Sequence, residues 1–337
     1  MREPAAQEFL QAAGWGDAAR IPLTGDASAR SYQRLALAGQ TAILMDNAPG
    51  GADDPASFVA IARHLRSLSL SAPEVLAADL NLGFLLLEDL GDAVFARILQ
   101  ASPEAELALY TAATDVLLHL QAHPAPSGLP NLGAADWAEA AMLALEFYGF
   151  AITGARPDAS ALRDAVGGAL MRLADGPRVL ILRDYHAENL IWLPEREGIA
   201  RVGLLDFQLG QMGQPAYDLV SLLQDARRDV RPETEAVLIR HFAAASGQDA
   251  HSFSAAYATV GAQRALRILG IFARLCLVAG KAGYVRLIPR VWGQLQRNLA
   301  HPALAGLRAV CDAVLPTPTP EALLQIEARC TLAPTRC

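Results

Sequence analysis

The sequence predicts an α+β protein with a small sheet-rich N-terminal lobe and a larger helical C-terminal lobe that carries an embedded β-hairpin. Three observations support this prediction. Short strand-like runs fill the first 90 residues, helical spacing of apolar residues dominates after Leu90, and an island of strands interrupts the helices between residues 179 and 205. We therefore expect two domains, residues 1–90 and residues 91–337.

The N-terminal lobe begins with three short strands, which we expect at residues 21–24, 31–38 and 41–45. Turn-forming residues lie between them. Asp54 followed by Pro55 is typical of a helix N-terminus, and apolar residues then follow at helical spacing as far as Leu65. A continuous apolar run at residues 83–87, bounded by acidic residues, predicts a buried strand.

The C-terminal lobe is predicted to be mainly helical, because its apolar residues recur every three or four positions. The expected helices cover residues 107–120, 137–148, 161–173, 234–245, 253–278, 288–299 and 319–330. The expected strands cover residues 179–182, 190–193 and 200–205, and the turn-forming run at 194–198 would join the last two into a hairpin.

Composition excludes several classes of protein. The chain is 53% hydrophobic and 19% charged, which is typical of a globular protein and not of a disordered one. A net charge of -7 argues against nucleic acid or an anionic membrane as the main partner. The chain has no run of about 20 uncharged apolar residues for a spanning helix, and its N-terminus has no apolar signal-peptide core. Its 4 cysteines form no Cys-x-x-Cys pair, so we expect reduced thiols and a cytoplasmic location.

Polar residues suited to phosphoryl transfer lie in the strand island. Asp184 lies five residues before Asn189, and Asp206 ends the partner strand of the hairpin. Hairpin pairing would bring Asn189 and Asp206 together, and two oxygen ligands suit Mg²⁺, which completes its shell with phosphate and water. Asp184 would face an acceptor hydroxyl. Each residue alone is more often a turn or capping residue, but the combination favours a site.

The motifs of this island resemble those of a known family. Residues 182–193, 204–208 and 213–219 resemble the aminoglycoside phosphotransferase and choline kinase-like superfamily. The runs at 183–189, 206–208 and 217–228 are more narrowly similar to its branch of bacterial anomeric N-acetylmuramate/N-acetylglucosamine kinases, as are residues 25–28 and 85–90. The resemblance extends from about residue 20 to about residue 230.

The resemblance implies a two-lobed protein-kinase-like fold and an enzyme that uses ATP and Mg²⁺. It implies transfer of phosphate to the anomeric hydroxyl of N-acetylmuramate or N-acetylglucosamine, giving the sugar 1-phosphate during peptidoglycan recycling. Asp184 would be the catalytic base, and Asn189 and Asp206 would be the Mg²⁺ ligands. Asp218 would hold the catalytic loop together, and His186 would either orient the base or simply fill the core.

The resemblance also implies where the nucleotide binds. The backbone of Glu88, Asp89 and Leu90 would hold adenine, as the hinge does in kinase-like folds. The phosphate-covering loop would consist of Gly25, Asp26, Ala27 and Ser28.

The sequence departs from the family pattern at the phosphate grip. Met45 stands where most kinase-like folds place a lysine, and the sole lysine of the chain is Lys281. The helix expected from Pro55 also lacks the acidic partner of that lysine. Arg30 and Arg34 flank the phosphate-covering loop and could supply the missing cation, since a guanidinium suits phosphate, or both could be solvated strand residues.

Leu182 replaces a supporting histidine two residues before the base, and residues 209–212 are more apolar than the branch leads us to expect.

Alternatives remain open for the acceptor. A cationic acceptor of the aminoglycoside, choline or fructosamine type would need a carboxylate-lined pocket, which Glu139, Glu146, Asp225 and Asp229 could provide. A non-catalytic nucleotide-binding protein is a further alternative, motivated by the missing lysine.

The sequence offers one candidate residue for contact with the acceptor. Arg227 begins a basic cluster and could bind the lactyl carboxylate of N-acetylmuramate, or it could belong to a solvated helix end that complements the helix dipole. No pattern indicates the oligomeric state.

Overall fold

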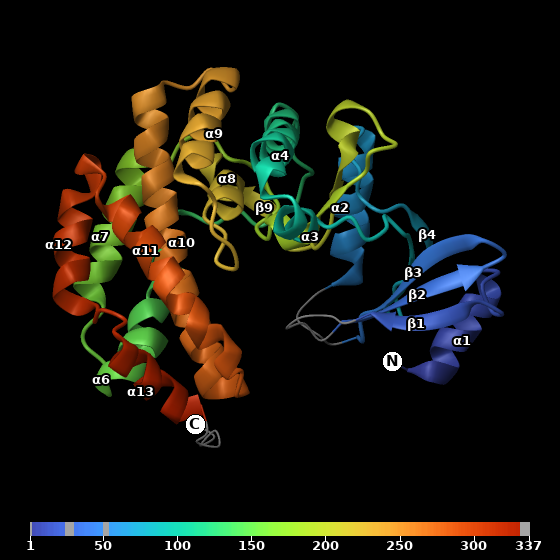
Figure 1. The fold of residues 1–337 in the computed structure, drawn as a ribbon, viewed down its shortest axis with the longest axis horizontal. Coiled ribbons are helices and arrows are strands. Elements are labelled where there is room, and N and C mark those ends of the chain that lie inside the picture. Colours follow the sequence, from blue (N-terminus) through green and yellow to red (C-terminus); the bar gives the residue numbers. More distant parts are fainter. Residues whose placement is uncertain (1, 24–29, 50–53, 331–337) are drawn as a thin grey trace. The chain divides into compact units, whose positions relative to one another are not determined.

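The computed structural model describes residues 2–23, 30–49 and 54–330, and Figure 1 shows its ribbon. The chain packs as two compact units, Met1–Leu129 with Leu182–Gln211, and Pro130–Ile181 with Met212–Cys337. These units do not coincide with the expected division at residue 90, because residues 91–129 and 182–211 pack with the N-terminal segment. The assignment of nucleotide binding to residues 1–90 and of the acceptor site to residues 91–337 stays a prediction.

The first unit contains a five-stranded antiparallel sheet with the strand order β1-β2-β3-β5-β4. Figure 1 shows β1, β2 and β3 of this sheet side by side. Their bounds are β1 (Ala19–Leu23), β2 (Ser31–Leu37), β3 (Gln40–Asp46), β4 (Val75–Asp79) and β5 (Phe84–Glu88). Four of the five are confirmed predictions, and β4 was not predicted.

Helix α1 (Glu3–Ala12) packs on this sheet. Phe9 and Leu10 of the helix join Leu35 and Leu44 of the central strands in one buried cluster, and the Phe9 ring stacks on Phe84 with centroids 5.7 Å apart. Fully burying such side chains contributes about 1.5–3 kcal/mol each. Helix α1 was not predicted.

Three further helices of the first unit are α2 (Pro55–Ser67), α3 (Phe95–Ala101) and α4 (Glu106–Gln121), with a 3₁₀ turn at Pro103–Ala105. The side chain of Asp54 accepts a hydrogen bond from the backbone N–H of Ala56, which confirms the predicted helix start. The Phe58 ring of α2 stacks on Phe207 at 4.8 Å between centroids. Helix α2 therefore supports the residue that directly follows Asp206.

The predicted hairpin is present as β7 (Leu190–Trp192) and β8 (Val202–Leu204), joined through a 3₁₀ turn at Gly198–Arg201. It is tied to the first unit by hydrogen bonds from Leu204 N–H to the Ser71 carbonyl and from Trp192 N–H to the Ala93 carbonyl. The bond from Leu204 fixes the end of β8 that leads to Asp206, and the bond from Trp192 holds the opposite end of β7.

A second small sheet pairs β6 (Val179–Ile181) with β9 (Gln211–Gly213). A Cβ atom at Gly213 would lie 2.3 Å from Ile181 Cδ1, so a larger residue would clash there. The strand β9 was not predicted.

Helices make up the second unit, and most were predicted. Their bounds are α5 (Ala134–Ala141), α6 (Phe150–Thr153), α7 (Ser160–Leu173), α8 (Ala216–Leu223), α9 (Pro232–Ala245), α10 (Ala250–Ala279), α11 (Ile288–Leu299), α12 (Ala305–Val314) and α13 (Pro320–Cys330). A π turn at Ala144–Gly149 lies against α10, where a Cβ atom at Gly270 would be 2.2 Å from the Leu143 carbonyl carbon. Glycine thus permits this close approach. None of the described helices is long and apolar enough to cross a membrane.

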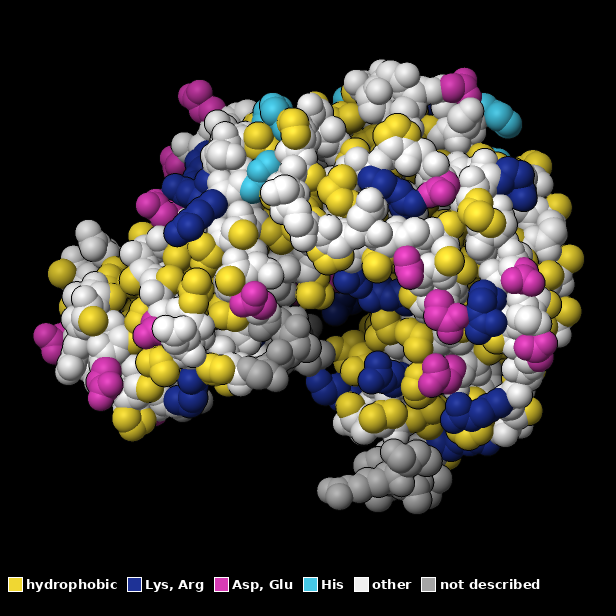
Figure 2. Space-filling model, turned by 180° about the vertical axis from the view of Figure 1, so that it is seen from behind, with side chains coloured by type: hydrophobic (Ala, Val, Ile, Leu, Met, Phe, Trp, Pro, Cys, Tyr) yellow, Lys and Arg dark blue, Asp and Glu magenta, His cyan; other side chains and the backbone are white. Residues whose placement is uncertain are grey.

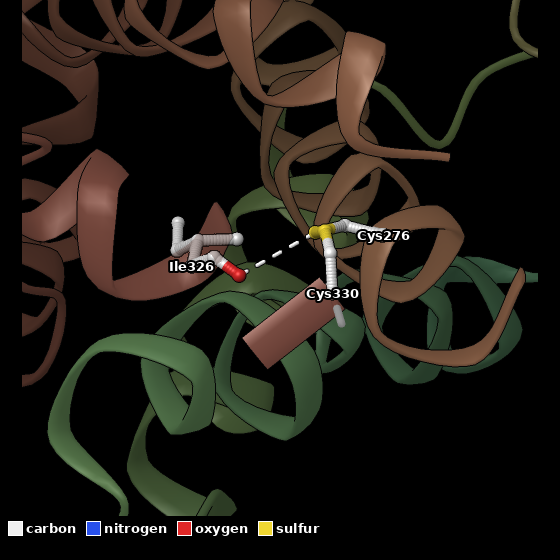
Figure 3. The surroundings of a disulfide bond; sticks show 3 residues. All are labelled: Cys276, Ile326 and Cys330. Atoms are coloured by element: carbon white, nitrogen blue, oxygen red, sulfur yellow. Dashed lines mark hydrogen bonds between the residues drawn. A yellow bond between two sulfur atoms is a disulfide. The ribbon is translucent and has the colours of Figure 1, made fainter. Parts of the chain in front are cut away.

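A disulfide joins Cys276 of α10 to Cys330 of α13, with the two Cα atoms 4.9 Å apart (Figure 3). The expectation of reduced thiols is therefore wrong for this pair. Packing of α13 on α10 brings together two cysteines that are separated by 54 residues in the sequence, a distance at which spacing gives no signal.

Cys311 is a free buried cysteine, and burial raises the pKa of its thiol to about 12.

The surface carries both signs of charge. On the face shown in Figure 2, arginine and lysine side chains lie scattered among acidic and hydrophobic ones. This mixture fits the composition of 28 basic and 35 acidic residues in the whole chain.

Candidate active site

The hairpin register places Asn189 next to Asp206. Leu190 pairs with Leu204, and the N–H of Leu205 donates to the Asn189 carbonyl at 3.0 Å. Asn189 and Asp206 therefore leave the same end of the hairpin. The predicted proximity of these two residues is confirmed.

The loop between β6 and β7 holds Asp184 beside them. The Asn189 side-chain amide donates to the Asp184 carbonyl oxygen at 2.9 Å, and its nitrogen lies 3.4 Å from His186 Nε2. The Tyr185 hydroxyl donates to the Ala113 carbonyl of α4 in the buried interior. The Asp184–Asn189 spacing is thus fixed by the asparagine side chain itself. His186 is buried beside this amide, and its role stays a prediction.

Two residues of this region have backbone angles that L-amino acids rarely adopt. Arg183, directly before Asp184, has φ 73°, and Asp206 has φ 55°. Such left-handed conformations cost free energy in residues other than glycine, and they concentrate at functional sites. Neither position is a glycine, so no residue type indicated these conformations.

The carboxylate of Asp206 has two donors in the first unit. Arg30 donates from Nη2 to Oδ1 at 2.6 Å, and Gln208 donates from Nε2 to the same oxygen at 3.1 Å. The Arg30 side chain is 6% exposed, and that of Asp206 is 35% exposed. Arg30 therefore lies at the predicted metal ligand. Gln208 was not predicted as a site residue, although it ends the family-like run at residues 206–208.

The oxygen donors fit a Mg²⁺ ion. The amide nitrogen of Asn189 is already bonded, so its oxygen is the atom left for a ligand role, and among the described residues no partner contacts Asp206 Oδ2. One amide oxygen and one carboxylate oxygen form the small protein ligand set that Mg²⁺ accepts. No cluster of three or more His, Cys, Asp or Glu suited to a metal exists in the part of the chain that the structure describes.

Ion pairs hold the acidic side chains of the predicted hinge. Arg66 and Arg196 bind the Glu88 carboxylate. Arg34 binds Asp89 and Asp92, each at 2.7 Å, and these hydrogen bonds, led by the one to Asp92, raise the pKa of the Arg34 guanidinium. The guanidinium of Arg34 thus binds the acidic side chains at and near the predicted hinge.

The main chain of the hinge has spare hydrogen-bonding capacity. The Leu90 N–H forms no backbone hydrogen bond with any residue in the described ranges. This free donor fits the predicted recognition of adenine by the hinge backbone.

Other predicted nucleotide contacts lie elsewhere or outside the described residues. Met45, at the expected lysine position on β3, is 1% exposed and pairs with Leu85 of β5. It is a core residue. Gly25, Asp26, Ala27 and Ser28 lie outside the described residues, so their predicted role stays a prediction.

The second unit contains the remaining predicted residues. Asp218 of α8 is 0% exposed, in agreement with a structural role. Arg227 is exposed, and its backbone N–H donates to Asp225 Oδ1 at 2.8 Å. Of the carboxylates considered for a cationic acceptor, Glu139 pairs with Arg163 and Asp229 pairs with Arg290.

Asp225 gives a pH-dependent prediction. Burial raises the pKa of its carboxyl, against the hydrogen bond from Arg227 and the charges of Arg227, Arg264 and Arg228. The folded protein therefore binds this proton more tightly than the unfolded chain. The resulting stability is complete below the unfolded pKa and is lost as the pH rises through the folded pKa. The amide of the Asp225→Asn variant would not titrate, so the wild type alone should lose this stability as the pH rises. We expect the Tm of the Asp225→Asn variant, relative to that of the wild type, to increase by about 2 °C or more from pH 4 to pH 8.

Thermal melts across this pH range check that expectation. The exposed Asp164→Asn on α7 is the matched control and should keep a constant difference from the wild type. A difference for Asp225→Asn that does not change with pH would contradict the argument.

A kinase-like fold with this hairpin defines a phosphotransferase, and the comparisons agree. Residues 20–260 match the model of the phosphotransferase enzyme family. The chain is 41% identical to the N-acetylmuramate/N-acetylglucosamine kinase of Caulobacter vibrioides, over 94% of this chain and 98% of that one. The chain belongs to the phosphotransferase enzyme family.

Two more similarities extend the comparison. The chain is 32% identical to the N-acetylmuramate/N-acetylglucosamine kinase of Pseudomonas aeruginosa, over 89% of this chain and 90% of that one. The solved structure of a choline kinase from Streptococcus pneumoniae superposes with a TM-score of 0.57 at 14% identity, over 91% of this chain and 99% of that one. The latter similarity confirms the predicted fold class.

Proposed function

We propose that this protein is an ATP-dependent kinase that phosphorylates the anomeric hydroxyl of N-acetylmuramate, N-acetylglucosamine or both, in cytoplasmic peptidoglycan recycling. The observation that carries the proposal is the assembly of Asp184, Asn189 and Asp206 at one end of the β7–β8 hairpin. The names of relatives that align over nearly the whole chain support the choice of sugar.

Asp184 acts as the base in this proposal. Its carboxylate accepts the proton of the anomeric hydroxyl, whose oxygen forms a bond to the γ-phosphorus of ATP while the bond to the bridging oxygen breaks and ADP leaves. The hydrogen bond from Asn189 to the Asp184 backbone fixes the position of the base. Catalysis of this kind is mainly positioning and electrostatics.

Asn189 and Asp206 hold Mg²⁺ in the proposal, and the bound ion supplies positive charge to the phosphates. The backbone of Glu88, Asp89 and Leu90 binds adenine. In the proposal, Gly25, Asp26, Ala27 and Ser28 would cover the phosphates, and Arg30 would supply a positive charge near the metal ligand.

An acceptor screen tests the function. ADP release, coupled to a spectroscopic readout, is measured with N-acetylmuramate, N-acetylglucosamine, choline, an aminoglycoside and a fructosamine. We expect turnover on the two N-acetylated sugars and none on the methyl glycoside of N-acetylglucosamine, because its anomeric oxygen carries no proton. Turnover on a cationic acceptor alone would support the rival kinase function. ATP binding without turnover on any acceptor would support a non-catalytic role.

Arg227 is the proposed contact for the lactyl carboxylate of N-acetylmuramate. Loss of a charge-assisted hydrogen bond costs about tenfold or more in affinity. We therefore expect Arg227→Gln to raise KM for N-acetylmuramate about tenfold and to leave KM for N-acetylglucosamine nearly unchanged.

Steady-state kinetics on both sugars check this prediction, with the exposed Arg240→Gln on α9 as the control. Equal changes in KM for the two sugars in Arg227→Gln would show that Arg227 has a structural role and does not bind the lactyl carboxylate.

A further inference from the structure

Arg30 and Asp206 form an ion pair across 176 residues of sequence. Arg30 lies directly before β2, and Asp206 follows β8. The guanidinium Nη2 contacts Asp206 Oδ1 at 2.6 Å, and the arginine side chain is the more buried of the two, at 6% exposed against 35%. The pair therefore places a buried positive charge directly on the predicted metal ligand.

Among the described residues, both hydrogen-bond donors to this carboxylate bind the same oxygen. Gln208 Nε2 donates to Oδ1 at 3.1 Å, alongside Arg30, and no described residue contacts Oδ2. A divalent cation at Oδ2 would have to share the carboxylate with the guanidinium. Two like charges on one small group repel each other strongly where burial limits solvent screening. The carboxylate is therefore a weaker ligand for a free cation than an unpaired aspartate would be.

We propose that Arg30 is a positioning residue that serves as the resident counter-charge of Asp206 and keeps divalent cations from binding tightly until the nucleotide is present. The phosphates of a bound nucleotide carry negative charge that offsets both the Arg30 guanidinium and the metal ion. Metal then enters the site with the nucleotide and not before it. This inference rests on the proposed function, because it takes Asp206 as the metal ligand.

Metal binding to the nucleotide-free protein tests the proposal. Mn²⁺ is the probe, because it accepts the same oxygen ligands as Mg²⁺ and its binding is followed by electron paramagnetic resonance without turnover. We expect Arg30→Gln to bind Mn²⁺ at least about tenfold more tightly than the wild type, because the repelling charge is gone. Arg30→Lys keeps the charge and should stay within about threefold of the wild type.

Two controls separate charge from other effects. Gln208→Ala removes the neutral donor from the same oxygen and should leave the Mn²⁺ affinity near that of the wild type. The exposed Arg97→Gln on α3 removes a positive charge elsewhere in the same unit and should also have no effect. The tight Mn²⁺ site of Arg30→Gln should disappear when Asp206→Ala is added.

Several results would overturn the proposal. One is an Arg30→Gln protein that binds Mn²⁺ no more tightly than the wild type, and another is a tight site that survives Asp206→Ala. Arg30→Met is measured in parallel, so that one poorly folded variant does not decide the outcome. Wild-type turnover in the acceptor screen is a separate readout, so a failed screen and a failed metal experiment are distinguishable.

Discussion

Asp184→Asn should lower turnover on the best acceptor by about 10²–10⁴-fold, the usual cost of removing a general base. The amide has the size of the carboxylate but cannot accept the hydroxyl proton. The backbone carbonyl of Asp184, which binds the Asn189 side chain, remains in place. We therefore expect the affinity for the nucleotide to stay near that of the wild type.

Two measurements are needed for this variant. Coupled ADP release gives turnover, and calorimetric titration with ADP gives nucleotide affinity. The exposed Asp164→Asn carries the same chemical change on α7 and should retain full activity. Near-normal turnover in Asp184→Asn, with an unchanged Tm, would show that the interpretation of Asp184 as the base is wrong.

Local patterns explain why the hairpin was predictable. Asn189 precedes β7 and Asp206 follows β8, so their proximity follows from ordinary hairpin pairing of these two strands. The start of α2 was also readable, because an Asp-Pro pair has a known capping geometry. Helix α1 was missed, although the spacing of Ala6, Phe9 and Leu10 is helical and could have revealed it.

Long-range pairings explain what the sequence could not predict. Arg30 and Asp206 are brought together by the tertiary fold, and nothing near either residue identifies its partner. The pairing of Arg34 with Asp89 and Asp92 likewise depends on sheet geometry, so two arginines that looked equivalent in the sequence have different positions. Left-handed backbone at Arg183 also has no composition signal, since glycine is absent there.

We propose that Arg30 supplies the positive charge that a strand lysine provides in most kinase-like folds. Met45 is fully packed in the sheet, so no charged side chain extends from that position. Arg30 instead brings a cation to the metal ligand from the start of β2. A forked guanidinium binds a carboxylate or a phosphate with directed hydrogen bonds, which an ammonium group does not match.

Asp206→Ala should abolish Mg²⁺-dependent turnover. Metal-based charge stabilisation is worth several kcal/mol in a transition state, so the expected loss is about 10³-fold or more. Asn189→Ala should have a smaller effect, because a neutral amide oxygen is the weaker of the two ligands for a hard cation.

The ion pair with Arg30 requires a control for stability. Asp206→Ala leaves the buried guanidinium of Arg30 without this partner, which should lower Tm. The double variant Asp206→Ala with Arg30→Gln removes both charges and should recover part of that loss in Tm, while turnover stays abolished. Activity is measured over a Mg²⁺ titration for the wild type and for each variant. Metal-independent turnover, or an unaltered Mg²⁺ requirement in a well-folded Asp206→Ala protein, would show that Asp206 is not the metal ligand.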